Sequence, residues 1–179
     1  MRHIPNILSA IRLLMVGAFV WLFAEKRYLA SLAVFGAAYA TDVLDGWLAR
    51  RFGWVTDIGN LLDPVADKLM TVAALACICF GRQRPIYLVI LVLIAVKELL
   101  MLIGGLLMVR RHVIAVAAWP GKVATGLFAA GVILALLSFQ YPAVEPWSIG
   151  VLIAATALSW FALFYYAGGQ LTAALAKRK

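Results

Sequence analysis

Apolar residues run along this chain in six long stretches that short polar segments separate. Each stretch has roughly the 20 residues that a helix needs to cross the hydrocarbon core of a bilayer. The pattern predicts helices over about residues 6–24, 28–51, 57–80, 85–109, 120–139 and 147–171. Pro85 and Pro120 suit the first turn of a helix, where a missing N–H costs nothing. Gly53 and Gly81 suit chain reversals between helices.

The composition gives the class of protein. Of 179 residues, 65% are hydrophobic and 13% are charged, whereas soluble domains are roughly half apolar and a quarter charged. A water-soluble fold of this length could not bury so much apolar surface. We therefore predict a single all-α integral membrane domain over residues 1–179, with six transmembrane helices.

Lysine and arginine residues divide unequally between the two sets of helix ends. Because cytoplasmic loops carry an excess of these residues, the richer set, which includes both termini, is expected in the cytoplasm. The net charge of +8 then follows from membrane orientation, and no basic patch indicates binding to nucleic acid. The richer set is Arg2, Arg50, Arg51, Arg110, Arg111, Lys122, Lys177, Arg178 and Lys179, and the poorer set is Lys26, Arg27, Arg82 and Arg84.

Two pairs of aspartates interrupt the second and third apolar stretches. Asp42 and Asp45 are three residues apart, and Asp63 and Asp67 are four apart, so each pair shares one helical face. A charge inside a membrane helix costs several kcal/mol and usually has a function. Since the turn around Gly53 makes the two helices antiparallel neighbours, we expect the four carboxylates to converge.

Four carboxylates in one low-dielectric site raise each other's pKa, and bound cations would relieve this repulsion. An all-oxygen site favours hard ions such as Mg²⁺ or Mn²⁺. Four ligands suit a pair of such ions, an arrangement that catalyses phosphoryl-type displacements.

Small residues and one arginine lie beside the aspartates. Gly46, Ala49 and Gly59 share their helical faces and would leave room for a substrate. Arg50 directly follows Ala49, and its guanidinium could bind a phosphate there through two hydrogen bonds. The cluster lies near the cytoplasmic end of both helices, so the site is expected to face the cytoplasm.

The aspartates and the small residues around them resemble, in type and spacing, the full signature of the CDP-alcohol phosphotransferase family. The matching run is Asp42-Val-Leu-Asp45-Gly46-Trp-Leu-Ala49-Arg50, then eight residues, Gly59, three residues, Asp63, three residues and Asp67. Three further segments are similar to bacterial phosphatidylglycerophosphate synthases of that family. They are Pro5-Asn6-Ile-Leu-Ser9-Ala-Ile-Arg12, Asp63-Pro64-Val-Ala66-Asp67-Lys68 and Gly121-Lys122-Val-Ala-Thr125.

The resemblance implies a role for each signature position. Asp42, Asp45, Asp63 and Asp67 would bind the metal pair, and Asp67 would also be the general base. The CDP moiety would lie against Gly46, Ala49, Arg50 and Gly59. A phosphatidyl group would pass from CDP-diacylglycerol to an alcohol with release of CMP. The resemblance also implies a homodimer among the lipids of a bacterial-type cytoplasmic (inner) membrane.

The acceptor alcohol is less well defined by the sequence. Many phosphatidylglycerophosphate synthases have an Arg-Glu pair in the fourth helix, where this chain has Lys97-Glu98. We expect sn-glycerol 3-phosphate as acceptor, with phosphatidylglycerol, serine or an inositol phosphate as alternatives. The candidate residues for acceptor or phosphate binding are Arg12, Lys97, Arg110, Arg111 and Lys122.

Other interpretations remain open at this stage. The arginines and Lys122 could be cytoplasmic anchors alone, and Lys97 and Glu98 could pair with residues of other helices. The aspartates could form buried ion pairs with Lys68, Lys97 or Arg50. Intramembrane acids also line ion pathways, so a cation-coupled transporter is the alternative outside the family.

Overall fold

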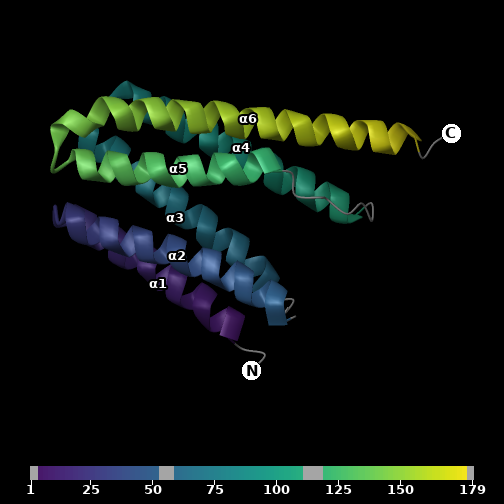
Figure 1. The fold of residues 1–179 in the computed structure, drawn as a ribbon, viewed down its shortest axis with the longest axis horizontal. Helices are drawn as coiled ribbons and strands as arrows, with labels where there is room; N and C mark the ends of the chain where they lie inside the picture. Colours follow the sequence, from purple (N-terminus) through teal and green to yellow (C-terminus); the bar gives the residue numbers. More distant parts are fainter. Residues whose placement is uncertain (1–3, 53–58, 111–118, 177–179) are drawn as a thin grey trace.

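A computed structural model shows the chain as a bundle of long α-helices (Figure 1). The structure describes the backbone of residues 4–52, 59–110 and 119–176, and the side chains of residues 11–41, 68–104 and 119–165. The described residues contain helices and no strand. The elements are α1 (Ile4–Ala24), α2 (Tyr28–Phe52), α3 (Gly59–Arg82), α4 (Pro85–Arg110), α5 (Trp119–Ser138), the 3₁₀ turn η1 (Pro142–Val144) and α6 (Glu145–Ala176).

The helix ends lie within two residues of the expected ones, except at the end of α6. That helix continues to Ala176 rather than ending near Leu171. Its last residues, Ala173, Ala174, Leu175 and Ala176, have side chains with strong helix propensity and contain no Gly or Pro to stop the helix.

Two of the turns are closed by residues in the left-handed backbone region. Lys26, with φ 59°, ends α1 in a Schellman arrangement, in which its N–H bonds Phe23 O at 2.9 Å and the N–H of Arg27 bonds Leu22 O at 2.9 Å. Gln83, with φ 52°, ends α3 with a single bond from its N–H to Cys79 O.

Gly81 was expected to form the reversal after the third helix, and this prediction is wrong. Gly81 is still helical, and the positive φ belongs to Gln83 two residues later. A Cβ on Gly81 would come within 2.9 Å of the Phe139 ring and 3.0 Å of the Phe23 ring. Glycine is therefore used here for close packing of aromatic rings and not for a turn.

Helices α5 and α6 form the most extensive helix pair of the bundle, while α1 packs against both α2 and α3. Helix α4 connects the two groups, since it contacts α3 on one side and α6 on the other. One core continues through the bundle, and its fully buried members include Phe19, Leu75, Ile78, Tyr87 and Leu152. The turns between α1 and α2, α3 and α4, and α5 and α6 lie at one end of the bundle (Figure 1).

A polar cluster joins the end of α3 and the turn after it to the end of α5 and the start of α6. Glu145 pairs with Arg82 at 3.4 Å and with Arg84 at 3.0 Å. Arg82 also donates to Ser138 Oγ at 2.7 Å and lies 4.4 Å from the centre of the Phe139 ring. Because Glu145 is buried, these partners replace the hydrogen bonds to water that its carboxylate has lost.

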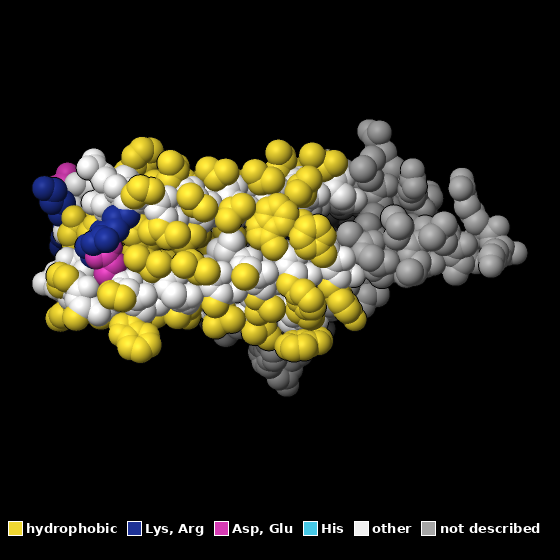
Figure 2. All heavy atoms as spheres, turned by 90° about the horizontal axis from the view of Figure 1, so that it is seen from above, with side chains coloured by type: hydrophobic (Ala, Val, Ile, Leu, Met, Phe, Trp, Pro, Cys, Tyr) yellow, Lys and Arg dark blue, Asp and Glu magenta, His cyan; other side chains and the backbone are white. Residues whose placement is uncertain are grey.

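The surface has the character of a membrane protein. Within the described residues, three segments are long and apolar enough to cross a bilayer: 85–104, 119–138 and 142–165. Figure 2 shows hydrophobic side chains covering the middle of the visible face, with charged side chains gathered at one end. Large apolar side chains such as Leu88, Val92 and Phe164 are exposed on the surface of the bundle, which is favourable in a bilayer and unfavourable in water.

Candidate functional site

The four aspartates lie on two helices that contact each other. Asp42 and Asp45 are in α2, and Asp63 and Asp67 are in α3. The predicted helical spacing within each pair therefore holds for the backbone. Their side chains lie outside the described set, so the convergence of the carboxylates stays a prediction.

The positions expected to bind CDP follow the same two helices. Gly46, Ala49 and Arg50 are in the last turns of α2, and Gly59 is the first residue of α3. The donor set fits a hard divalent ion in its chemistry, because both helices contribute carboxylates only. Among the side chains that are described, no group of three or more His, Cys, Asp or Glu could hold a metal.

The bundle contains a cavity of about 210 Å³, and the first of its lining residues along the chain is Lys68, which follows Asp67. It lies among α3, α4, α5 and α6, and its polar wall comes from all four helices. A cavity needs only about 10–15 Å³ on this scale to admit one water, so this one has room for a small polar molecule. Its lining residues are Lys68, Thr71, Ile94, Lys97, Glu98, Met101, Thr125, Phe128 and Ser159.

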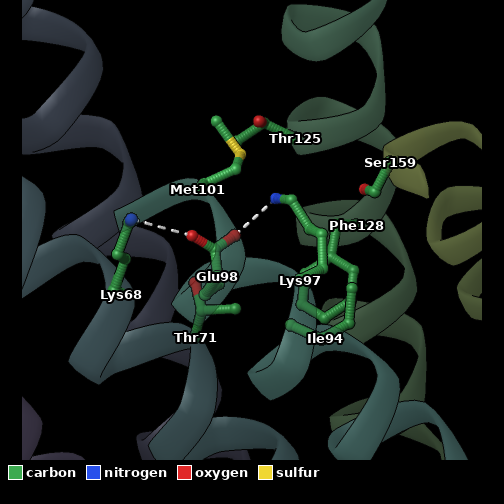
Figure 3. Close-up of a pocket in the computed structure, with 9 residues that line it drawn as sticks. All are labelled: Lys68, Thr71, Ile94, Lys97, Glu98, Met101, Thr125, Phe128 and Ser159. Carbon is green, nitrogen blue, oxygen red and sulfur yellow. Dashed lines mark hydrogen bonds and ion pairs between the residues drawn. The ribbon is translucent and has the colours of Figure 1, made fainter. Parts of the chain in front are cut away.

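Three charged side chains meet on one wall of this cavity. Glu98 of α4 lies between two lysines and directs one carboxylate oxygen to each (Figure 3). Lys68 Nζ of α3 is 3.0 Å from Glu98 Oε2, and Lys97 Nζ donates to Glu98 Oε1. The side chains of Lys68, Glu98 and Lys97 are 33%, 21% and 14% exposed. The two ammonium groups and one carboxylate give the cavity a net charge of +1 in its described part.

Three hydroxyl groups add hydrogen-bonding capacity to the cavity. Thr71 lies one helical turn after Asp67 in α3, Thr125 is in α5, and Ser159 is in α6. Sequence reasoning did not select them as site residues. Thr71 could have been found from its four-residue spacing to Asp67, and Thr125 from its place in the Gly121–Thr125 segment. Ser159 is a single hydroxyl in a long apolar helix and carries no such signal.

The expected acceptor residues do not all reach this cavity. Lys97 lines it, whereas Arg12 of α1 is only 2% exposed and lines a separate small gap with Tyr39 and Met70. Thr71 borders both spaces. Lys122 is exposed on α5, one turn before Thr125. Arg110 is the last residue of α4 and its side chain is not described, and Arg111 lies outside the described residues.

The two lysines resolve part of an open question about the fourth helix. Glu98 pairs with Lys68 of another helix, and the same two residues border the cavity with Lys97. The structural interpretation therefore holds for Glu98, whose partner Lys68 is in another helix, and a part for Lys97 and Glu98 in acceptor binding stays a prediction.

These features define a class: a helical membrane protein with two carboxylate pairs on contacting helices and a positively charged cavity lined by Lys68, the residue after Asp67. The chain belongs to the CDP-alcohol phosphatidyltransferase family, whose sequence profile matches residues 2–167. Membership argues against the transporter interpretation, since the family is one of transferases.

Named relatives agree with that assignment. A probable phosphatidylglycerophosphate synthase of Mycobacterium tuberculosis is 34% identical over 146 residues, or 78% of this chain and 68% of the relative. A CDP-diacylglycerol–glycerol-3-phosphate 3-phosphatidyltransferase of Aquifex aeolicus is 32% identical over 109 residues, or 61% of each chain. A cardiolipin synthase (CMP-forming) of Streptomyces coelicolor is 37% identical over 115 residues, or 61% of this chain and 52% of the relative. The match thus spans less than two thirds of the Aquifex and Streptomyces proteins.

Proposed function

We propose that this chain transfers a phosphatidyl group from CDP-diacylglycerol to an alcohol in phospholipid biosynthesis, and that the alcohol is sn-glycerol 3-phosphate. The product would then be phosphatidylglycerophosphate. One observation carries the proposal: the complete family signature on α2 and α3 leads directly into a polar cavity with an excess of positive charge.

The aspartates Asp42, Asp45, Asp63 and Asp67 would hold a pair of divalent ions, Mg²⁺ or Mn²⁺. When bound, such ions neutralise diphosphate charge and stabilise the charge that develops on the leaving group. The small residues Gly46, Ala49 and Gly59 leave room for the nucleotide, and Arg50 pairs with its phosphate.

In the proposed reaction the carboxylate of Asp67 takes the proton of the acceptor hydroxyl while the hydroxyl oxygen attacks the lipid-side phosphorus. A bond forms between this oxygen and the phosphorus. The bond from the phosphorus to the bridging diphosphate oxygen breaks, and CMP leaves with the electron pair. Positioning the hydroxyl beside its base supplies much of the rate enhancement in such a step.

The choice of acceptor rests on the size and charge of the cavity. A net charge of +1, with hydroxyls from Thr71, Thr125 and Ser159 around it, suits a small anion that also carries hydroxyl groups. Serine has no net charge at neutral pH and gains less from such a site. Glycerol 3-phosphate meets both requirements.

Phosphatidylglycerol is the second candidate acceptor, because the Streptomyces relative is named as a cardiolipin synthase. Its headgroup also presents a phosphate and hydroxyls. It carries two acyl chains as well, which would have to remain in the bilayer outside the cavity.

Several architectural features complete the proposal. We propose one domain over residues 1–179, six membrane-spanning helices, and both termini and the active site on the cytoplasmic side of the inner membrane. The unequal distribution of Lys and Arg supports this orientation. A homodimer is proposed from the family resemblance alone.

The test is an acceptor panel. The purified full-length chain is incubated with CDP-diacylglycerol, Mg²⁺ or Mn²⁺ and one acceptor at a time, and CMP release is measured. We expect metal-dependent CMP release with glycerol 3-phosphate. Release with phosphatidylglycerol alone would replace the acceptor, and no release with any acceptor would overturn the proposed activity.

A further inference from the structure

We infer that Glu98 controls acceptor affinity by occupying Lys97 until an acceptor phosphate replaces it, while the Glu98–Lys68 pair stays in place. The inference rests on the proposed function for the identity of the acceptor. It assigns Glu98 as a specificity-determining residue that competes with the ligand, and Lys97 as the cation that the phosphate receives.

The two ion pairs of Glu98 differ in kind. The Lys68–Glu98 pair joins α3 to α4 at 3.0 Å, so it holds two helices together. The Lys97–Glu98 pair joins neighbours in one helix, and adjacent helical residues do not face each other. Lys97 must therefore bend its long side chain to reach Glu98, and releasing it separates no helices.

The surroundings of Lys97 identify it as the cation available to a ligand. Figure 3 shows its ammonium on the side of the cavity that α5 and α6 form, with Thr125 and Ser159 on those helices. Its side chain is 14% exposed, so it is largely removed from bulk water and its bond to an anion is poorly screened. A phosphate monoester in the cavity would be within reach of Lys97 and Ser159, and of Thr125 once its hydroxyl turns away from Gly121 O, to which it donates at 3.0 Å.

Glu98 also sets which anions bind. Its negative charge repels any anion that enters, so a ligand must bind the Lys97 ammonium more strongly than the Glu98 carboxylate does. A phosphate monoester carries close to two charges and three acceptor oxygens at neutral pH. A phosphodiester such as the phosphatidylglycerol headgroup carries one charge and competes less well for Lys97.

Calorimetry with the full-length chain in lipid nanodiscs tests this directly. Glycerol 3-phosphate and inorganic phosphate are titrated into the wild type and into Glu98→Gln, which keeps the size of the side chain and removes its charge. We expect roughly tenfold tighter binding of both ligands to Glu98→Gln, as one charge-assisted hydrogen bond no longer has to be exchanged. Affinity that is unchanged or weaker would overturn the inference.

Two controls separate this role from a structural one. Glu98→Asp keeps the charge and should show no tightening. Glu145→Gln removes another acid that pairs with two cations, at the far end of the bundle, and should not tighten phosphate binding. Tightening in either control would also overturn the inference. Phosphatidylglycerol in the nanodisc should compete with glycerol 3-phosphate only weakly, and strong competition would assign the site to a lipid headgroup and overturn the preference for a monoester.

If Glu98→Gln does not fold, the same calorimetry on Lys97→Met and Lys68→Met tests the inference. We expect Lys97→Met to lose at least tenfold in phosphate affinity and Lys68→Met to lose mainly thermal stability. An equal or reversed loss of affinity would refute the division of roles. Binding is measured without CDP-diacylglycerol, so absence of CMP release would overturn the proposed activity and leave this result standing.

Discussion

The contact between α5 and α6 depends on one missing side chain. A Cβ on Gly131 of α5 would lie 2.8 Å from Leu152 Cδ2 and 3.3 Å from the Leu152 backbone nitrogen of α6. Leu152 is fully buried, so its side chain has little room to turn away. Gly131→Ala would therefore push the two helices apart.

The expected magnitude follows from two opposing effects. Placing a methyl group in a packed interface costs about 1–3 kcal/mol, and replacing a helical glycine by alanine gains about 1 kcal/mol. Gly126 in the same helix provides the matched control, because a Cβ there would meet no atom within 4 Å. Gly126→Ala should thus be neutral or slightly stabilising, and Gly131→Ala should be about 1–3 kcal/mol less stable than this control.

The assay is thermal unfolding of the purified chain with a thiol-reactive fluorescent dye. Cys77 and Cys79 are partly buried in α3, so the dye reports the loss of packing. At about 2–4 °C per kcal/mol for a chain of this size, the two alanine variants should differ by about 2–12 °C. Equal unfolding temperatures for Gly131→Ala and Gly126→Ala would show that α5 and α6 separate at no cost, and would refute the reasoning.

Two other predictions address the two ends of the bundle. Glu145→Gln leaves Arg82 without its counter-charge; since both side chains are mostly buried, the cost should lie between those of exposed and buried pairs, at about 1–2 kcal/mol. A lower unfolding temperature in the same dye assay would agree, and an unchanged one would show that the pair adds no stability. Asp67→Asn should lower turnover at least about 100-fold, as loss of a general base does, while CDP-diacylglycerol binding, followed by equilibrium dialysis, is largely kept. Loss of metal binding as large as in Asp42→Asn would mean that Asp67 is mainly a ligand.

Much of the fold could be predicted from the sequence, because membrane helices are marked by hydrophobic length, and nearly every helix end lies within two residues of the expected one. The signature on α2 and α3 was likewise readable, since its residues are close in the chain. The role of Gly81 could not be predicted from the sequence, because glycine occurs both in turns and at close helix contacts. Only the positions of Phe23 and Phe139 show that Gly81 belongs to the second kind.

The cavity itself was the least predictable part. Its wall needs Lys68 of α3, Glu98 of α4, Thr125 of α5 and Ser159 of α6 to meet, and the sequence does not specify how four helices are rotated about their axes. A spacing rule relates residues within a helix and says nothing of a partner more than twenty positions away. The pairing of Lys68 with Glu98 therefore emerges only from packing.

The cluster around Arg82 has a mechanical consequence for α3. Arg82 fixes one end of this helix to both Ser138 and Glu145, while Lys68 lies 14 residues earlier in the same helix, or about 21 Å away at about 1.5 Å per residue. The helix is thus a lever with its pivot at the charged turn. A tilt of only about 5° would move Lys68 by about 2 Å, enough to break a bond that tolerates a few tenths of an ångström. The stiffness of this pivot, on the opposite side of the membrane from the proposed chemistry, would therefore govern how sharply the cavity is defined.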